Sequence, residues 1–206
     1  MKYILLIITL LAFKINYSQA TKDSIFKQNI NALVEEMEFM YGYDQMLREY
    51  TFYKTFDKSE TDSIEQLSDS LVTLEIEKRK FKSEKTSKLI WENYINPKDK
   101  EHTERMIEII KTYGFPTSDR IKMYYKEPFN DAEFNPYILL VHAPKEYWEE
   151  LKPLIKTELD EGRINICTYG HLLWHFTGRQ SFQPMLDNGY ELVEENGKTI
   201  LKSTCK

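Results

Sequence analysis

The sequence predicts a mainly α-helical, bundle-like single domain with a small β-hairpin at its C-terminal end. Apolar residues recur every three or four positions through most of the chain, which is typical of helices that bury one face. Glycine and proline are scarce, with 7 of each in 206 residues. Asn196-Gly197, between two short alternating segments, is a strong hairpin signal. We therefore expect one helical domain over residues 21–206, with a hairpin over residues 190–202.

Residues 1–20 are typical of a secretory signal peptide. Lys2 gives a positive start, residues 4–13 are almost wholly apolar, and Ser18 and Ala20 are small residues of the kind that precede a cleavage site. The apolar run is shorter than the about 20 residues that a membrane-spanning helix needs. We expect cleavage near Ala20, export to the periplasm or the cell exterior, and no membrane span.

Residues 24–56 are expected to form the first helix, because apolar residues alternate at spacings of four and three along one face. These residues are Phe26, Ile30, Leu33, Met37, Met40 and Leu47. Asp44 interrupts the stripe where the next apolar residue should stand. Burying a carboxylate without a partner is costly, and Arg48, four residues on, is placed to pair with it on the same helix face.

The segment over residues 57–96 is highly charged and is a candidate insertion in the domain. A second, long helix is expected within it, over residues 60–95. Its acidic residues cluster near the start and its basic residues near the end, an order that suits the helix dipole. A solvated outer face accounts for these charges, and a docking surface for a partner is the alternative.

Shorter elements are expected in the second half of the chain. Asp99 is placed to cap a third helix that runs to Tyr113, where Gly114 supplies a stop. Residues 115–134 are expected to be a long irregular loop, and such loops inside a compact domain are often functional. Further helices are expected over residues 135–142, 146–159 and 168–176, and strands over residues 190–193 and 199–201.

The composition excludes some classes of partner. The formal net charge is −5 and the basic residues are dispersed, whereas nucleic-acid binding relies on clustered Lys and Arg. The chain also has neither a glycine-rich phosphate loop nor a Gly-x-Ser-x-Gly motif. We therefore expect no nucleic-acid partner and no cofactor, and the partner is an unidentified small molecule or protein.

Two cysteines, Cys167 and Cys205, have two interpretations. In an exported protein they could form a disulfide, which is worth roughly 3–4 kcal/mol for a loop of this length. The alternative is a buried Cys167 and a free Cys205 near the end of the chain.

The cluster of Asp44, Gln45 and Arg48 is the strongest candidate site. In one interpretation it is an internal ion pair that fixes helix packing. In the other, Asp44 orients a general base or polarises a ligand, while Arg48 holds an anionic group. The two interpretations are compatible.

Two isolated histidines are candidates for proton transfer. His102 falls on the apolar stripe of the third helix, and His142 ends an apolar run before Ala143 and Pro144. Histidine titrates near neutral pH, so either residue could carry a proton beside the Asp44 carboxylate. The simpler interpretation of each is a hydrogen-bonded core residue.

His171 and His175 lie four residues apart, so they share one face of a helix. This spacing can hold zinc, but a zinc site needs further ligands. Leu172 stands where the metalloprotease motif has its glutamate. We therefore expect no metal, with these two histidines as weak candidates.

Several short motifs, taken in order, form a wider pattern. They are Asp44-Gln45-x-x-Arg48, Asp99 with His102-Thr103, Tyr113-Gly114-Phe115-Pro116, Leu140-Val141-His142-Ala143, Gly162, Tyr169 with Leu172, and Gly178-x-Gln180-x-Phe182. Over residues 35–185, the pattern resembles an uncharacterised family of exported bacterial proteins, many from the Bacteroidetes, described as a domain of unknown function. The resemblance implies class and location, and it brings no established activity.

Three functions are compatible with these residues. In the first, an exported globular protein binds a ligand or partner in a polar cleft. The residues expected to line that cleft are Asp44, Gln45, Arg48, His102, His142, Tyr169 and Gln180. In the second, the same cleft belongs to a hydrolytic enzyme, with His142 or His102 as base, Asp44 as its partner and Arg48 binding an anion. In the third, the protein is a structural or interaction protein that acts through the charged second helix.

Overall fold

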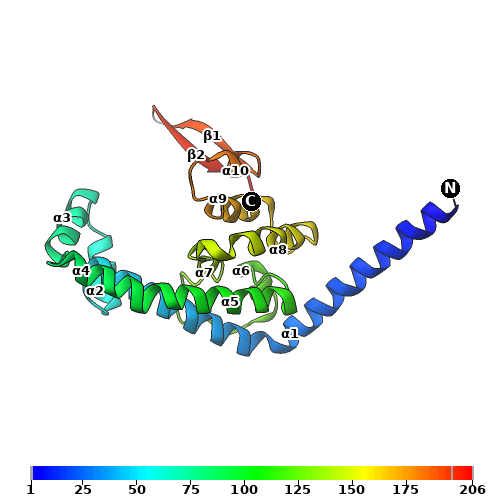
Figure 1. Cartoon of the computed structure of the whole chain (residues 1–206), viewed down its shortest axis with the longest axis horizontal. Coiled ribbons are helices and arrows are strands. Elements are labelled where there is room, and N and C mark those ends of the chain that lie inside the picture. Colours follow the sequence, from blue (N-terminus) through cyan, green and yellow to red (C-terminus); the bar gives the residue numbers. More distant parts are fainter. Residues whose placement is uncertain (1, 196, 206) are drawn as a thin grey trace.

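The chain is mainly helical and ends in a two-stranded antiparallel hairpin, as the sequence predicts (Figure 1). The computed structural model describes residues 2–195 and 197–205, with side chains from residue 21 onward. Within that part of the chain, no helix is both long and apolar enough to cross a bilayer. The side chains on which the signal-peptide prediction depends lie outside the described ones.

The core is built on α1 (Lys2–Tyr53), which lies alongside α5 (Asn96–Tyr113) (Figure 1). The apolar stripe predicted for the first helix is buried from Phe26 to Met40. The largest fully buried side chains of this core come from several elements, and they include Phe26, Met37, Met106, Ile110, Phe115, Leu140, Leu151 and Phe176. Burial of this apolar surface is the main force that holds the elements together.

The single long helix predicted over residues 57–96 is wrong. This segment forms α2 (Lys58–Glu65), α3 (Asp69–Arg79), α4 (Glu84–Ile90) and a π-helical turn, η1 (Trp91–Ile95), that runs into α5. Ser68 and Ser83 precede two of the new helices, in the position that serine favours, although neither side chain makes a capping hydrogen bond. The apolar seam of α3 also gains no packing, since Leu71 and Leu74 are 47% and 49% exposed.

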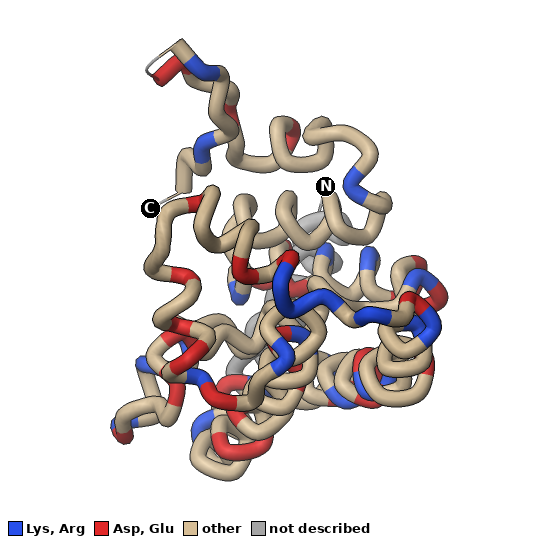
Figure 2. The backbone as a smooth tube through the Cα atoms, turned by 90° about the vertical axis from the view of Figure 1, so that its left-hand side faces the viewer, with Lys and Arg blue, Asp and Glu red and all other residues tan. Residues whose placement is uncertain are grey.

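The charges of this segment do form a solvated face. Lys78 contacts Glu75 at 2.5 Å and Arg79 contacts Glu60 at 2.8 Å, and all four side chains are at least partly exposed. Figure 2 shows acidic and basic residues interspersed along the backbone between longer uncharged stretches. Exposed pairs of this kind contribute little to stability.

The predicted third helix corresponds to α5, and it ends at Gly114 as predicted, with φ of 79° at that residue. It begins at Asn96, so Asp99 lies within its first turn instead of capping it. The irregular loop predicted over residues 115–134 contains a further helix, α6 (Ser118–Tyr124). Thr117 caps α6 by accepting a hydrogen bond from the backbone N–H of Arg120, a local signal that the sequence reading missed.

The remaining elements follow in short succession. They are α7 (Ile138–Val141), a 3-10 turn (Lys145–Tyr147), α8 (Trp148–Asp160), α9 (Ile166–His175), α10 (Gln183–Leu186), β1 (Tyr190–Glu195) and β2 (Lys198–Ser203). Glu195 pairs with Lys198 at the end of the hairpin where the two strands are joined. Asn196 of the predicted turn lies outside the described residues. The Cys167–Cys205 disulfide forms and ties α9 to the segment after β2.

A buried charge network joins α1 to α6 and α8. The Glu158 carboxylate has no exposed surface and accepts hydrogen bonds from Arg163 Nη2 at 2.8 Å and Lys22 Nζ at 3.2 Å. Arg120 donates to the Asp23 carboxylate at 2.6 and 3.1 Å. Burial alone would raise the pKa of Glu158, but its hydrogen bonds and the neighbouring cations hold the pKa below its ordinary value.

Candidate functional site

Asp44 is the centre of a polar cluster at the junction of α1, α5 and α7. Only 4% of this residue is exposed. Gln45 Nε2 donates to one carboxylate oxygen at 2.7 Å, and Arg48 Nε donates to the other at 3.0 Å. The helical spacing of four residues places Arg48 on the same face as Asp44, as predicted. The break in the apolar stripe therefore marks a buried carboxylate with partners.

Arg48 bridges two carboxylates from different helices. Its Nε donates to Asp44 of α1, and its Nη2 donates to Asp99 of α5. The guanidinium carbon also lies 5.4 Å from the centre of the Trp91 ring, within the range of a cation–π contact. Arg48 is thus an ion-pair bridge between α1 and α5, and its positive charge is already neutralised by protein carboxylates.

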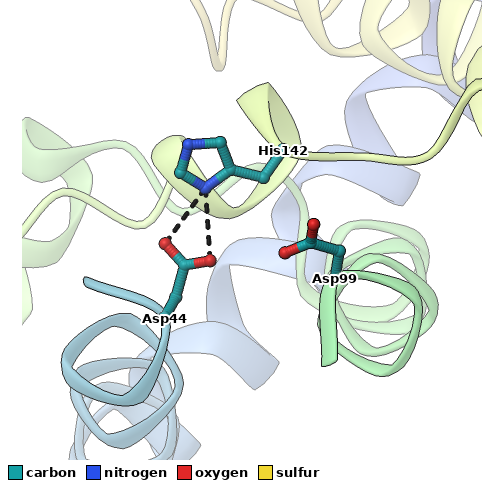
Figure 3. A group of neighbouring side chains, drawn as sticks. All are labelled: Asp44, Asp99 and His142. Atoms are coloured by element: carbon teal, nitrogen blue, oxygen red, sulfur yellow. Dashed lines mark hydrogen bonds and ion pairs between the residues drawn. The ribbon is translucent and has the colours of Figure 1, made fainter. Parts of the chain in front are cut away.

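His142 completes the cluster from the end of α7. Its Nδ1 lies 3.0 and 3.2 Å from the two oxygens of Asp44. Figure 3 shows the imidazole turned so that Nδ1 faces Asp44 and the second ring nitrogen points away from both carboxylates. The His142 side chain is 23% exposed. A histidine thus lies within hydrogen-bonding distance of Asp44, as the hydrolytic hypothesis requires.

The local electrostatics shift the pKa values of the two carboxylates in opposite directions. Burial alone would raise the pKa of Asp44, but the hydrogen bond and charge of His142, with Arg48, outweigh burial and lower that pKa. Burial raises the pKa of Asp99, in spite of the neighbouring Arg48, and the charge of Asp44 adds to this effect. Asp44 is consequently the carboxylate that stays ionised most readily.

An ionised Asp44 determines the tautomer of His142. A carboxylate only accepts hydrogen bonds, so Nδ1 of His142 must be the donor in this pair. In the neutral imidazole, the lone pair then lies on Nε2, the nitrogen that Figure 3 shows on the far side of the ring. This arrangement gives an oriented proton acceptor with partial access to solvent.

His102 lies beside the cluster without joining its hydrogen bonds. The residue is buried on α5, and its ring meets that of Tyr43 edge to face with centroids 6.3 Å apart. Its Nδ1 is buried and has no hydrogen-bond partner among the described residues. Burial lowers the pKa of His102, in spite of the opposing charge of Asp44. Of the two histidines considered for proton transfer, His142 therefore has the contact with Asp44.

Asp44, Asp99 and His142 are also the only three residues in the described part of the chain that together could hold a metal ion. Each offers a ligand atom, and these atoms lie within 4.8 Å of one another. However, Arg48 already bridges both carboxylates and supplies the positive charge that a cation would bring. The donor set therefore fits an ion-pair cluster better than a metal centre.

The two remaining predicted lining residues, Tyr169 and Gln180, do not belong to this cluster. Tyr169 is half-buried and packs against the core, and Gln180 is exposed in the turn after α9. Among the described residues, neither makes a hydrogen bond, ion pair or ring contact with Asp44, Arg48 or His142. The structure thus brings together Asp44, Gln45, Arg48 and His142, and it does not add Tyr169 or Gln180 to them.

His171 and His175 form part of an aromatic cluster on α9. Their ring centroids lie 4.8 Å apart, and His175 is also packed against Trp174. Burial, followed by the charges of His171, Arg179 and His142, lowers the pKa of His175 to about 4. Within the described part of the chain, these histidines have no third ligand for a metal.

Asp99 is the member of the cluster that the sequence analysis did not identify as a site residue. Its position in the first turn of α5 suggested a helix cap, and its pairing with Arg48 joins segments that are distant in the sequence. The only sequence signal was its presence in the ordered motif pattern. A long-range ion pair leaves no periodic trace in a single sequence.

Comparison with known proteins assigns no function to this site. No protein-family model, no curated protein and no solved structure matches the chain. The fold and the site define the class, which is a mainly α-helical protein with a partly exposed histidine held by a buried Asp–Arg–Asp cluster.

Proposed function

We propose that the protein is exported and binds a proton-donating ligand at the Asp44–His142 pair, where Nε2 of His142 accepts a hydrogen bond or a proton. The observation that carries this proposal is the contact of His142 Nδ1 with both oxygens of Asp44, at 3.0 and 3.2 Å. A carboxylate behind an imidazole fixes its tautomer and stabilises the imidazolium that forms on proton uptake.

Support for export comes from two independent features. Residues 1–20 have the composition of a signal peptide, and the Cys167–Cys205 disulfide is of the kind that persists in oxidising compartments. The motif order over residues 35–185 supports membership of the exported bacterial family described above. Membership of this family is therefore part of the proposed function.

Hydrolysis is the second candidate function, and the orientation of His142 favours it. If the proton donor is a water molecule, the Asp44–His142 pair acts as a general base that activates it. Arg48 is less suited to the predicted anion-binding role, because Asp44 and Asp99 already neutralise it. The hydrolytic reaction would therefore depend on proton transfer more than on electrostatic binding of an anion.

Binding at His142 is tested by NMR of the protein labelled with 15N-histidine. A fragment set of neutral alcohols, phenols and amides is titrated while the ring nitrogens are observed. We expect fragments to shift the Nε2 resonance of His142, and His142→Gln to lose binding of those fragments. If no fragment shifts this resonance, or if His142→Gln binds them as the parent does, the proposal is wrong.

Hydrolysis is tested with p-nitrophenyl acetate, which reports on a general base or an activated nucleophile. We expect His142→Gln and Asp44→Asn each to lower kcat/KM at least tenfold, and the parent pH profile to be lost in both. His175→Gln is the matched histidine control and should keep the parent rate. Equal rates for all four proteins would exclude the hydrolytic alternative and leave ligand binding as the function.

A further inference from the structure

A second candidate site is a cavity of about 780 Å³ between α1 at Asp23, α6, α9 and the C-terminal hairpin. Pockets that hold small molecules in proteins commonly have volumes of about 300–1,000 Å³. None of Asp44, Arg48 and His142 lines this cavity. It is therefore separate from the cluster on which the proposed function rests.

The walls of the cavity carry neutral hydrogen-bonding groups. The hydroxyls of Tyr137, Tyr190, Ser118 and Thr168 all belong to residues that line it. Within the described part of the chain, none of these four hydroxyls forms a hydrogen bond with the protein. Buried or half-buried hydroxyls without protein partners are available to a ligand or to water.

The two tyrosines face the same space. Burial raises the pKa of Tyr137, and the nearby Tyr190 raises it further, while burial also raises the pKa of Tyr190. Both phenols therefore keep their protons at neutral pH and act as hydrogen-bond donors and acceptors. The centroid of the Tyr137 ring also lies 5.7 Å from that of His171, with the two ring planes inclined by 58°, so this wall presents two partly apolar rings.

Most charged residues of the lining are paired within the protein, and the exception among the described residues is the exposed carboxylate of Asp119 in the first turn of α6. Arg120 is paired with Asp23 at 2.6 Å, and Arg163 is paired with the buried Glu158 at 2.8 Å. Burial lowers the pKa of His171, so this imidazole is neutral at physiological pH. The cavity thus combines aromatic faces and free hydroxyls with arginines that are already neutralised.

We infer that this cavity binds a neutral saccharide, because a sugar offers both an apolar ring face and many hydroxyls. The ring face would lie against the aromatic wall of Tyr137 and His171, and the sugar hydroxyls would bond Tyr190, Ser118 and Thr168. A phosphate would find its cations already paired, and an organic cation would meet a single unpaired carboxylate, that of the exposed Asp119. The complementarity favours a neutral polar ligand over either ion.

The disulfide gives the hairpin a part in this site. Cys167, Cys205 and Ser203 line the cavity together with Tyr190 of β1. The Cys167–Cys205 bond therefore fixes one wall of the cavity to α9. Gly189 allows this close approach, since a Cβ at that position would lie 2.7 Å from the Cys167 sulfur.

The inference is tested by calorimetric titration of the oxidised protein with maltotriose, cellobiose and N-acetylchitobiose as probes. We expect at least one of them to bind. A site that hydrogen-bonds ligand hydroxyls loses affinity when its own hydroxyls are removed. The double variant Tyr137→Phe/Tyr190→Phe, which keeps both rings, should therefore raise Kd at least tenfold.

Two further variants make this test specific. Ser118→Ala should also weaken binding, and it tests the cavity if the double variant does not fold. Tyr94→Phe is the matched control, because Tyr94 is 59% exposed outside the cavity, and it should leave Kd unchanged. Absence of binding by all three saccharides, binding of inorganic phosphate in their place, or equal Kd values for parent, double variant and Ser118→Ala would each overturn the inference.

Discussion

At the scale of single residues, the molecule is defined by polar groups that break apolar patterns. Asp44 stands where an apolar residue should be, and it is satisfied by Gln45, Arg48 and His142. The same contacts stabilise the junction of three helices and orient an imidazole. The cluster is therefore a structural feature and a candidate site at once, and variants must separate the two roles.

Replacing Asp44 by alanine should destabilise the protein, because it removes a buried partner of Arg48 and His142. The expected loss is about 3 kcal/mol in the free energy of unfolding. Urea denaturation at pH 7 measures it. Glu75→Ala removes an exposed pairing and should cost much less, because solvent screens pairs at the surface. Equal effects of the two variants would mean that the Asp44 cluster contributes no more than a surface pair.

His175 should make stability depend on pH between about 4 and 6.5. Its pKa is lowered from 6.5 to about 4 in the folded protein, chiefly by burial. The unfolded chain therefore binds a proton in this window that the folded chain does not, so the stabilisation present above pH 6.5 is lost as the pH falls. The expected loss by pH 5 is about 2 kcal/mol.

Urea denaturation of the parent and of His175→Gln at pH 7.5, 6 and 5 measures this contribution. Because both proteins share every other titrating group, their difference isolates His175. The free energy of unfolding of the parent, relative to that of His175→Gln, should fall as the pH falls from 7.5 to 5. A constant difference across this range would show that the pKa of His175 is not lowered on folding.

The sequence predicted part of this site and missed the rest for a physical reason. The periodic stripe of α1 marked Asp44, and the helical spacing marked Arg48. His142 was recognised only as a histidine at the end of an apolar run, and Asp99 was interpreted as a helix cap. Contacts between α1, α5 and α7 depend on tertiary packing, which local periodicity does not encode.

At the scale of elements, the sequence was most informative where burial and local signals agree. Burial and a local signal both supported three predictions: the first helix, the glycine that ends the third helix, and the C-terminal hairpin. The segment over residues 57–96 had a charge order and an apolar seam but no core to bury that seam. Short helices gain most of their stability from packing, so without a core to bury the seam the segment divides into several short helices.

Gly114→Ala should disrupt the end of α5. Gly114 has φ of 79° and ψ of 168°, a region that is nearly restricted to glycine and costs other residues about 1–3 kcal/mol. A Cβ there would also lie 2.5 Å from the Arg163 side chain, which pairs with buried Glu158. We therefore expect a loss of at least about 2 kcal/mol, measured by thermal or urea denaturation.

The chain offers a control for this variant within α1. Gly42 lies in the helix interior, and a Cβ at that position would meet nothing within 4 Å. Gly42→Ala should consequently stabilise the protein by about 0.5–1 kcal/mol. Destabilisation by both variants to the same extent would contradict the role assigned to the backbone at Gly114.

The hairpin should depend on its disulfide more than on its own packing. Its strands pair only with each other, and exposed positions dominate both of them. Reduction, or the double variant Cys167→Ser/Cys205→Ser, should lower the free energy of unfolding by about 3–4 kcal/mol for a loop of 38 residues. A parent whose unfolding is unchanged by reductant would show that the cross-link adds no stability.

At the scale of the whole molecule, the predicted cleavage site lies just before the residues that anchor α1 to the domain. Lys22 pairs with Glu158 of α8, and Asp23 pairs with Arg120 of α6. A mature chain that begins at Thr21 therefore keeps both contacts, whereas a chain that begins at Ser24 loses both. Removal of the leader therefore preserves both anchoring contacts as long as the cut falls before Lys22.

Export and anchoring are tested together by expressing the 206-residue chain in a bacterium with a general secretion pathway. We expect a periplasmic or secreted product whose mass and N-terminal sequence correspond to residues 21–206. A product that starts at Ser24 should unfold at lower temperature, because the buried Glu158 loses a cation and the buried Arg120 loses its carboxylate. Retention of an uncut chain in the cytoplasm would contradict the signal-peptide assignment. Equal melting temperatures for chains that begin at Thr21 and Ser24 would contradict the anchoring role of Lys22 and Asp23, whatever the location of the protein.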